Sequence, residues 1–415
     1  MIGRLNKILT AEMREIIARL GRLTDAPLYL VGGPVRDLVM NRKILDLDMA
    51  VEADPADLGA RLAADLHGTV LVHPRFHTCK ITTPAGTVVD LAQTRRESYP
   101  EPARLPVVEP GASIADDLAR RDFSIQAMAM RLNGSDAGQI VDPFQGRRDI
   151  DRRLIRILHP NSFRDDPVRA FRAARYSARF GFRLERQTAA ALRDLTRRPE
   201  WLRIASDRVM DEWHRAFEEE KWIAALRALG RMGLLAWLGI RWPVDLKALR
   251  RMDGSFKTVR TWYDPPTPFP LWASRFVAFL SLVPAPVRLR IGRSLPFSKI
   301  IKKPFQAAVD AARLATTLNA DLRPSRIVDL LERVPPEWMP VLHARAAGRA
   351  RRHIQRYIYI WRGARPPVTG DDLRNWGVPP GPAYPRLLHR IRAAALDGRI
   401  RVPEDIRRIV ERAKI

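Results

Sequence analysis

The sequence has very little cysteine and no long apolar run. Cys79 is the one cysteine in 415 residues, so no internal disulfide can form and no thiolate cage for a metal ion is available. The longest apolar stretch, Leu271–Val283, is broken by Arg275 and falls short of the roughly 18 to 20 residues that a membrane span needs. The N-terminal residues lack the apolar core of a signal peptide. We therefore expect a protein of the reducing cytoplasm that does not enter a membrane.

Acidic residues are scarce relative to basic ones. Lys and Arg number 72 against 46 Asp and Glu, a net charge of +26, while 46% of residues are apolar, which indicates a folded chain. Residues 1–110 hold 14 basic and 14 acidic residues, so the whole excess lies in the remaining 305. A positive field favours a polyanionic partner, with nucleic acid first and an anionic membrane surface second. The alternative is a basic surface that serves solubility only.

The apolar pattern predicts an α+β fold, with a mixed β-sheet in the N-terminal part and helices beyond about Asp149. Short β-branched runs predict five strands, at Leu28–Val31, Leu45–Val51, Thr69–Val72, Lys80–Thr83 and Thr87–Leu91. The proline-rich stretch Arg95–Gly111 is predicted as a long loop. A helix is predicted near Phe123–Arg131, and no repeat of fixed period is present.

Two aspartates stand at alternate positions in the second predicted strand. Side chains alternate across a strand, so Asp46 and Asp48 are expected on one face while Leu45 points into the core. Two carboxylates at this spacing repel each other unless a cation lies between them, and hard oxygen ligands suit Mg²⁺ better than Zn²⁺. Asp90, at the end of a later strand, is a candidate third carboxylate. The alternative is a solvated strand face.

The first predicted strand ends in Gly32 and Gly33, and Pro34 then suits the first turn of a helix. Backbone N–H groups at such a turn and helix start can receive the phosphates of a nucleotide. Either motif alone is weak, because Gly-Gly is also an ordinary surface turn. The Gly-Gly turn followed by the two alternate aspartates is more specific than either motif alone, and it favours a metal-dependent phosphoryl site.

Five motifs follow one another in order between Val31 and Glu212. They are Val31-Gly32-Gly33-Pro34-Val35-Arg36-Asp37 with Asp46-Leu47-Asp48; Arg120-Arg121-Asp122-Phe123-Ser124-Ile125-Gln126-Ala127; Asp142-Pro143-Phe144-Gln145-Gly146; Asp165-Asp166-Pro167-Val168-Arg169; and Asp207-Arg208-Val209-Met210-Asp211-Glu212. With this set the chain resembles the class II tRNA nucleotidyltransferase and bacterial poly(A) polymerase family of the polymerase β superfamily. The resemblance implies a nucleotidyltransferase head followed by helical neck, body and tail.

The resemblance also implies roles in catalysis and nucleotide binding. Asp46 and Asp48 would hold the metal ions that bind the triphosphate and activate the primer 3′-hydroxyl, with Asp90 as a further catalytic candidate. Arg121 and Asp122, predicted at a helix start, suit a clamp on triphosphate and sugar, in which Asp122 accepts from the ribose 2′-hydroxyl. The remaining nucleotide-binding candidates of the head and of the following helix are Gly32, Gly33, Arg36, Arg172 and Arg175.

Asp166 and Arg169 are the candidates for nucleotide selection. Family members use this pair as a protein template that reads the Watson–Crick edges of CTP and ATP, and the spacing of three places both on one face of a helix. The alternative role for Asp166 is an N-cap, which Pro167 favours. For Arg208 and Glu212 we favour an i,i+4 ion pair that stiffens the neck.

The helix predicted over Pro167–Phe180 presents its arginines within an arc of about 120°. They are Arg169, Arg172, Arg175 and Arg179. Such a stripe can line the triphosphate and primer site, although a stripe of this kind is often a solvated face. Among the departures from the family motifs, Gln126 replaces Asn, and we expect its extra methylene to weaken orientation near the ribose and metal.

Residues 341–415 carry 17 basic and six acidic residues with tyrosine and tryptophan between them, which fits contact with an RNA backbone and occasional stacking. The alternative is an ordinary basic helical bundle. We expect four parts: a nucleotidyltransferase head at 1–150, a helical neck with the nucleotide-selecting template at 151–220, a helical body at 221–340, and a basic RNA-binding tail at 341–415.

The function that the sequence favours is addition of CCA to the 3′ end of tRNA from CTP and ATP, with Mg²⁺, without a nucleic-acid template, and with release of pyrophosphate. The alternatives are a poly(A) polymerase, a partial CC-adding or A-adding tRNA nucleotidyltransferase, and a non-catalytic RNA-binding protein on the same scaffold. The presence of the Arg95–Gly111 region argues mildly against a CC-only enzyme, which in this family often has it shortened. The oligomeric state stays open.

Overall fold

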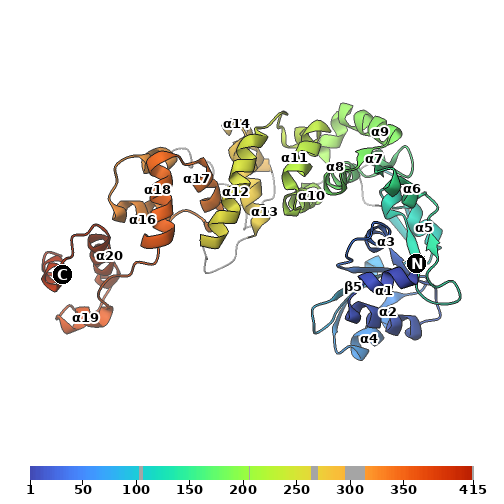
Figure 1. Cartoon of the computed structure of the whole chain (residues 1–415), viewed down its shortest axis with the longest axis horizontal. Coiled ribbons are helices and arrows are strands. Elements are labelled where there is room, and N and C mark those ends of the chain that lie inside the picture. Colours follow the sequence, from blue (N-terminus) through green and yellow to red (C-terminus); the bar gives the residue numbers. More distant parts are fainter. Residues whose placement is uncertain (102–105, 205, 263–269, 295–313, 414–415) are drawn as a thin grey trace. The chain divides into compact units, whose positions relative to one another are not determined.

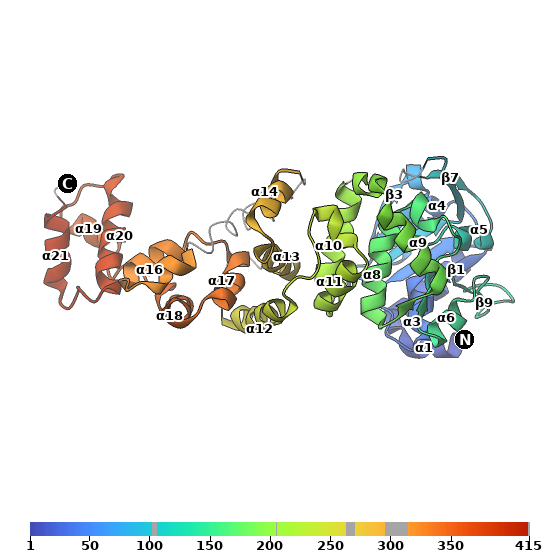
Figure 2. The same ribbon diagram turned by 90° about the horizontal axis from the view of Figure 1, so that it is seen from above.

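The computed structural model describes residues 1–415 except 102–105, 205, 263–269, 295–313 and 414–415. The chain forms two compact units, Met1–Trp213 with Glu220–Trp237, and His214–Glu219 with Leu238–Ile415. The first unit holds the mixed sheet and its helices, and the second is helical (Figures 1 and 2). This confirms the predicted α+β class. The four-part division by function stays a prediction.

A seven-stranded mixed sheet forms the centre of the first unit, in the order β3-β4-β5-β2-β1-β8-β9. Only β2 and β5 are parallel neighbours in it. The strands are β1 Leu28–Val31, β2 Leu47–Val51, β3 Thr69–His73, β4 Thr78–Thr82, β5 Val88–Gln93, β8 Ala129–Arg131 and β9 Ile140–Val141. All four residues of β1 are buried, as expected of a strand covered on both faces.

Helices surround this sheet and continue beyond it. They are α1 Ile2–Ile8, α2 Ala11–Leu23, α3 Gly33–Val39, α4 Pro55–Asp65, α5 Ile114–Ala119, α6 Gly146–Asp151, α7 Ser162–Asp165, α8 Val168–Phe180, α9 Arg186–Arg197 and α11 Trp222–Arg231, while α10 Ser206–Glu218 spans both units. The 3₁₀ turns of this unit are η1 Pro74–Phe76, η2 Ser124–Gln126, η3 Pro199–Arg203 and, crossing into the second, η4 Leu234–Leu238.

Side-chain alternation gives the sheet two differently covered faces. Tyr29 of β1 packs with Ile114 of α5 on one face. On the other face α4 packs against β3, β4 and β5, where Gly59 lies against Cys79. Asp48 lies two residues before Ala50, the register partner of Tyr29, and Asp90 of β5 is the register partner of Asp48. Both aspartates therefore lie on the face of the sheet that α5 covers.

The second predicted strand starts two residues late. Leu45, predicted to face the core, is 70% exposed, whereas Ile44 is 1% exposed and takes the core position. Asp46 consequently precedes the strand instead of lying within it. The prediction failed because an apolar residue next to a strand need not continue the alternation of that strand.

The Arg95–Gly111 stretch is a hairpin rather than a loop. Strands β6 Arg95–Ser98 and β7 Val107–Pro110 pair antiparallel, and the residues 102–105 between them lie outside the described part. Two of the prolines that suggested a loop fall next to or at the end of β7, where a missing N–H does not break the ladder.

The helix predicted over Phe123–Arg131 is also wrong. The chain makes the single turn η2 and then β8, which pairs with β1. Every residue from 122 to 130 is buried, so the segment has no polar face that could lie on the outside of a helix. Among the described residues beyond Asp149 the helical prediction is confirmed except for one small parallel pair of strands, β10 Leu154–Ile155 with β11 Arg183–Leu184.

Besides the end of α10, the described residues of the second unit form α12 Leu246–Trp262, α13 Leu271–Ser281, α14 Ala285–Ser294, α16 Pro324–Leu331, η5 Pro336–Trp338, α17 Met339–Arg345, α18 Gly348–Arg356, the π-helix η6 Tyr357–Trp361, α19 Gly370–Asn375, α20 Ala383–Leu396 and α21 Pro403–Glu411. Helix α12 packs on α13 and α17. The last three helices share a core of their own around Leu373, Ile391 and Ile406. Among helices in the described ranges, none is both long and apolar enough to cross a membrane.

Candidate active site

The Gly32-Gly33 turn joins β1 to α3 and requires glycine at its first position. Gly32 has a φ of 68°, and a Cβ placed on it would lie 2.5 Å from Arg121 Nη1. A Cβ on Gly33 would lie 3.8 Å from Asp48 Oδ2. The turn therefore brings the backbone against the two side chains that were predicted to bind nucleotide and metal.

Asp48 lies directly opposite Asp90 in the parallel register of β2 and β5. Burial raises the pKa of the Asp48 carboxyl, the charges of Asp90 and Asp46 raise it further, and Arg121 acts in the opposite direction. The three predicted carboxylates are thus brought close enough to interact. Asp90 is half-exposed and pairs with Lys80, whose Nζ lies 3.0 Å from Asp90 Oδ1.

This carboxylate group suits a divalent cation. Burial is the largest cause of the raised pKa of Asp48, and the charges of Asp90 and Asp46 add to it, so a cation at this place would favour the ionised carboxylate. Among the described residues, no group of three or more His, Cys, Asp or Glu side chains is arranged to hold a metal ion on its own. Mg²⁺ commonly takes only one or two protein carboxylates and completes its shell with water and substrate phosphates. Asp46 and Asp48 fit that mode of binding.

Arg121 and Asp122 follow a helix instead of starting one, because α5 ends two residues before Arg121. Arg121 Nη2 lies 3.0 Å from Asp117 Oδ2, and its buried Nε has no hydrogen-bond partner in the described part of the chain. Asp122 is 7% exposed and accepts from Phe123 N at 2.9 Å and from Arg172 Nε at 2.6 Å. A buried donor without a protein acceptor is uncommon and leaves Arg121 suited to an anionic ligand.

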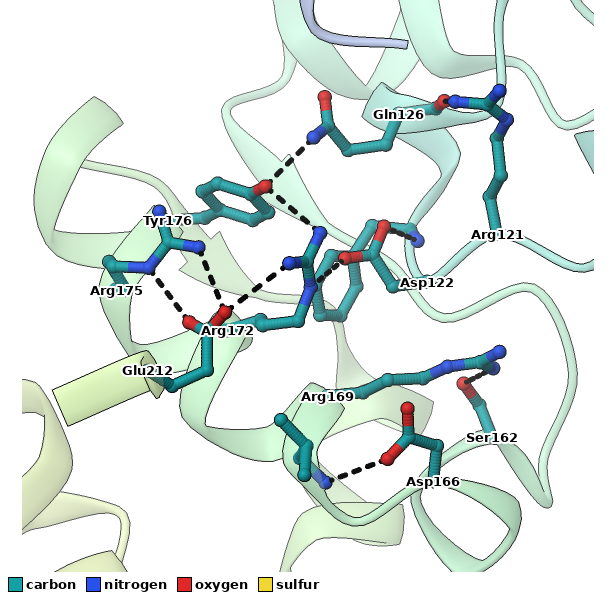
Figure 3. Close-up of polar contacts among 12 residues, drawn as sticks. Arg121, Asp122, Gln126, Ser162, Asp166, Arg169, Arg172, Arg175, Tyr176 and Glu212 are labelled. Atoms are coloured by element: carbon teal, nitrogen blue, oxygen red, sulfur yellow. Dashed lines mark hydrogen bonds and ion pairs between the residues drawn. The ribbon is translucent and has the colours of Figure 1, made fainter. Parts of the chain in front are cut away.

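The arginines at the centre of α8 belong to a buried network (Figure 3). Arg175 Nε donates to Glu212 Oε2 at 2.9 Å, while Arg172 Nη1 reaches Glu212 Oε1 at 3.3 Å and its Nη2 reaches the Tyr176 hydroxyl at 3.2 Å. Burial opposes the charge of Arg172, but Asp122, Tyr176 and Glu212 outweigh it and raise the pKa of Arg172 well above its ordinary value. The interpretation of these two residues as a solvated stripe is wrong.

Asp166 and Arg169 are both buried at the start of α8, with 8% and 4% of their surface exposed (Figure 3). Asp166 Oδ1 accepts from Val168 N at 3.2 Å, as a capping residue would, and Asp166 Oδ2 is 2.7 Å from Arg208 Nη2. Arg169 Nη1 donates to Ser162 Oγ at 2.8 Å. Asp166 has an extended backbone and precedes α8, so the prediction that both residues share one face of a helix is wrong. The two residues are still neighbours, because Arg169 N donates to the Asp166 carbonyl at 3.0 Å, and other groups hold each side chain separately.

The predicted ion pair between Arg208 and Glu212 along α10 is wrong. Arg208 reaches Asp166 instead, and Glu212 reaches Arg172 and Arg175. The i,i+4 spacing suggested a local pair, but both side chains point to the buried charges of α8. Helix α10 therefore contacts both Asp166 and the arginine network, which spacing within α10 could not reveal.

The side chain of Gln126, one methylene longer than that of Asn, makes two hydrogen bonds to protein groups. Its Oε1 accepts from Arg36 Nη1 at 2.5 Å and its Nε2 donates to the Tyr176 hydroxyl at 2.9 Å. Arg36 also makes a bidentate contact with Asp37, at 2.9 and 2.8 Å, and its guanidinium lies 4.7 Å from the centre of the Phe180 ring. Arg36, predicted to bind nucleotide, thus joins α3 to α8 through protein groups.

Comparison with known proteins agrees with this geometry. Residues 28–156 match the Poly A polymerase head domain family, and residues 181–239 match a family described as a probable RNA and SrmB-binding site of polymerase A. A CC-adding tRNA nucleotidyltransferase of Deinococcus radiodurans is 30% identical over 401 residues, which cover 96% of this chain and 91% of that protein.

Two further similar proteins bear on the fold of this chain and on its length relative to its relatives. A solved structure of a CCA-adding enzyme with ATP has a TM-score of 0.79 at 25% identity, and the match covers 100% of this chain and 98% of that one. An A-adding tRNA nucleotidyltransferase of Geobacter sulfurreducens is 30% identical over 414 residues, 97% of this chain but 47% of that protein. The chain spans about half or less of the length of the A-adding relatives that it matches.

The mixed sheet, the carboxylates beside the Gly-Gly turn and the matched head domain define a nucleotidyltransferase fold of the poly(A) polymerase kind. Within that class, the similarity along nearly the whole chain and nearly the whole Deinococcus protein places this chain in the class II tRNA nucleotidyltransferase family.

Replacing Asp48 with Asn should separate the catalytic effect of this carboxylate from its effect on stability. Because the folded-state pKa of Asp48 is raised, the metal-free protein loses stability as pH rises from the ordinary aspartate pKa through the folded value. Asp48→Asn should therefore raise the free energy of unfolding at neutral pH, with no gain below the ordinary pKa, while nucleotide addition falls at least about a hundredfold.

Urea unfolding across pH, with and without Mg²⁺, measures the stability of both proteins. Mg²⁺ should stabilise the native chain and leave Asp48→Asn unchanged. The control is Asp57→Asn, because Asp57 is 81% exposed and lies outside the site. Equal stabilisation of Asp48→Asn by Mg²⁺ would show that the ion binds elsewhere.

Replacing Glu212 with Gln should lower the free energy of unfolding, because buried arginines lose a carboxylate partner. The change removes the charge shared by Arg172 and Arg175, so we expect the first unit to lose about 3 kcal/mol of unfolding free energy. Thermal and urea unfolding measure this loss. Asp211→Asn, one residue away on an exposed position, should change stability by less than about 0.5 kcal/mol. Equal effects of the two variants would contradict the network.

Proposed function

We propose that this chain adds nucleotides to the 3′ end of tRNA without a nucleic-acid template, and that it builds the CCA end from CTP and ATP. The observation that carries the proposal is the buried pair Asp166 and Arg169. Within the described part of the chain, Arg169 makes three hydrogen bonds to protein oxygens, so two of its five N–H donors remain for a ligand. A fixed carboxylate beside a fixed guanidinium can read the edge of a base where no template strand is present.

The head supplies the chemistry of the same proposal. The 3′-hydroxyl oxygen of tRNA attacks the α-phosphorus of the incoming nucleotide, a phosphodiester forms, the bond to the β-phosphate oxygen breaks, and pyrophosphate leaves. Asp46 and Asp48 would hold Mg²⁺, which neutralises charge on the triphosphate and lowers the pKa of the attacking hydroxyl. The charge of Arg121 acts on Asp48, its Nη1 lies against Gly32, and its Nε–H, which has no partner among the described residues, suits a phosphate oxygen.

A second candidate is A-addition alone. The A-adding relative of Geobacter sulfurreducens is as similar in identity, at 30%, as the CC-adding relative of Deinococcus radiodurans. CC-addition alone is disfavoured by the hairpin β6–β7, which lies in the region that CC-only members of the family often shorten. Full CCA addition requires that one site accept both CTP and ATP, and a pair of side chains can do this by reading shared features of both bases.

One exposed helical face of the second unit indicates the kind of partner that this unit binds. Arg349, Arg352 and Arg356 of α18 lie within an arc of about 60° and are exposed. Tyr359 and Ile360 of η6 follow and are 59% and 63% exposed. Exposed arginines that continue into an exposed aromatic ring suit the phosphates and bases of RNA. We therefore propose that this face, residues 349–360, contacts tRNA.

The central test is nucleotide addition to tRNA that ends at the discriminator base. We expect two nucleotides with CTP alone, none with ATP alone and three with both, resolved on a sequencing gel. Addition of one A only to tRNA that already ends in CC would support the A-adding candidate. A long ladder of A on any RNA would indicate a poly(A) polymerase, and no addition to any substrate would overturn the proposal.

The RNA-binding face is tested by tRNA affinity at several salt concentrations. Arg352→Ala should weaken binding and reduce the slope of log affinity against log salt by about one, because one phosphate contact is lost. Tyr359→Ala should weaken binding by about tenfold with little change of slope. The control Arg61→Ala removes an exposed arginine of the first unit that pairs with Asp57. Unchanged affinity and slope in Arg352→Ala would place the RNA elsewhere.

A further inference from the structure

A row of four side chains crosses the sheet of the first unit and extends past the candidate metal ligand. Asp48 of β2 is the register partner of Asp90 on β5, and Asp90 is the register partner of Lys80 on β4. Lys80 in turn lies opposite Leu71 on β3. Register partners in adjacent strands share one face of a sheet and lie about 5 Å apart. Lys80 therefore stands on the same face as Asp48, two strand spacings or about 10 Å away.

The outer part of this row is open to solvent. The side chains of Lys80 and Asp90 are 47% and 48% exposed, and Leu71 is 57% exposed. A ligand can therefore approach the carboxylates across β3 and β4. The row offers that ligand one positive charge and, next to it, one apolar surface.

Lys80 keeps a hydrogen-bond donor for such a ligand. Its Nζ lies 3.0 Å from Asp90 Oδ1 and 3.2 Å from Asp90 Oδ2. An ammonium group has three N–H donors, and the two oxygens of Asp90 engage two of them at most. A half-exposed pair of this kind adds little to stability. Asp90 thus holds the ammonium group in place without using all of its donors.

The geometry of phosphoryl transfer assigns the two substrates to opposite sides of Asp48. The Gly32-Gly33 turn follows β1, which borders β2 on the side away from β5, and Arg121 Nη1 lies against this turn. The groups that suit a triphosphate therefore lie on the β1 side of Asp48. The attacking and leaving oxygens stand roughly in line across the phosphorus. With pyrophosphate leaving on the β1 side, the attacking hydroxyl arrives from the β5 side, where Lys80 lies.

We propose that Lys80 binds the last phosphodiester of the RNA strand that is extended, and that Leu71 packs against the adjoining sugar and base. This inference rests on the proposed function, because it takes an RNA 3′ end as the second substrate. Lys80 donates one N–H to a phosphate oxygen and stays paired with Asp90, which fixes the ammonium group. Anchoring the last phosphate orients the terminal ribose, so that its 3′-hydroxyl faces Asp48.

The deciding experiment removes the phosphate charge and the lysine charge separately and together. The full chain extends tRNA with a normal last phosphodiester or with an uncharged methylphosphonate there, and kcat/KM is measured for each. In the native chain the methylphosphonate should lower kcat/KM about tenfold, because a charge-assisted hydrogen bond is lost. Lys80→Met should cost about the same factor on normal tRNA, and the methylphosphonate should then cost little more. The KM for the incoming nucleotide should stay unchanged.

Arg61→Met is the matched control. Arg61 lies on α4, which packs on the other face of the sheet, and like Lys80 it is half-exposed and pairs with an aspartate, Asp57. Arg61→Met should extend normal tRNA as the native chain does and keep the full loss with methylphosphonate. Leu71→Ser should lower kcat/KM about threefold and also keep that loss. An unchanged kcat/KM in Leu71→Ser would exclude the apolar contact.

Lys80→Met also leaves Asp90 without its partner, which can alter the affinity for Mg²⁺. Each protein is therefore assayed at a saturating Mg²⁺ concentration, found from urea unfolding of the nucleotide-free chain at increasing Mg²⁺. If Lys80 acts only through the charge of Asp90, Lys80→Met will lose as much activity with methylphosphonate as the native chain does. That result would overturn the inference.

Failure of this inference and failure of the proposed function give different results. If the native chain adds no nucleotide to any tRNA end, the proposed function is wrong. If the native chain adds nucleotides and the methylphosphonate costs it nothing, or costs Lys80→Met just as much, the function stands and the phosphate contact of Lys80 is wrong.

Discussion

The site depends on buried charged side chains, each of which contacts a side chain of opposite charge. Asp122, Arg172, Glu212 and Arg175 form a continuous series of contacts from the end of α5 to α10, and none of these side chains is more than about a quarter exposed. A single unmatched member would leave a charge in a poorly solvated place at a cost of several kcal/mol. Because the partners come from α8, α10 and the segment after α5, compensation requires those elements to meet in one arrangement, which also places Asp166 and Arg169.

Much of the fold could be predicted from the sequence. Strand β1 has the predicted bounds, and the strands at β3, β4 and β5 lie within two residues of the prediction, because each is a short β-branched run with clear ends. The segment 122–130 was mistaken for a helix because its polar residues Asp122, Ser124 and Gln126 suggested an outer face, whereas tertiary contacts bury all of them. The hairpin β6–β7 was missed because prolines mark a loop unless the pairing partner is known.

For the site, motif order predicted which residues gather but not what each one contacts. Asp46, Asp48 and Asp90 interact as expected, and Asp166 lies beside Arg169. Arg208 and Glu212 were misjudged because their partners lie more than 35 positions away in the chain, on elements whose packing no local spacing reveals. The effect of Gln126 on ribose and metal orientation stays a prediction. Long-range ion pairs are decided by tertiary structure, whereas spacing within a helix reports only its own neighbours.

The proposed nucleotide-selecting pair is buried, the proposed RNA-binding face at 349–360 is exposed, and this difference has a practical consequence. Mobile ions screen exposed charges over a Debye length of about 10 Å at 0.1 M salt but act far less on charges enclosed by protein. Arg169 is buried, whereas Arg349, Arg352 and Arg356 are exposed to solvent. In the proposed function, higher ionic strength therefore weakens RNA binding and leaves base selection nearly unchanged, so the two can be varied separately in one unmodified protein.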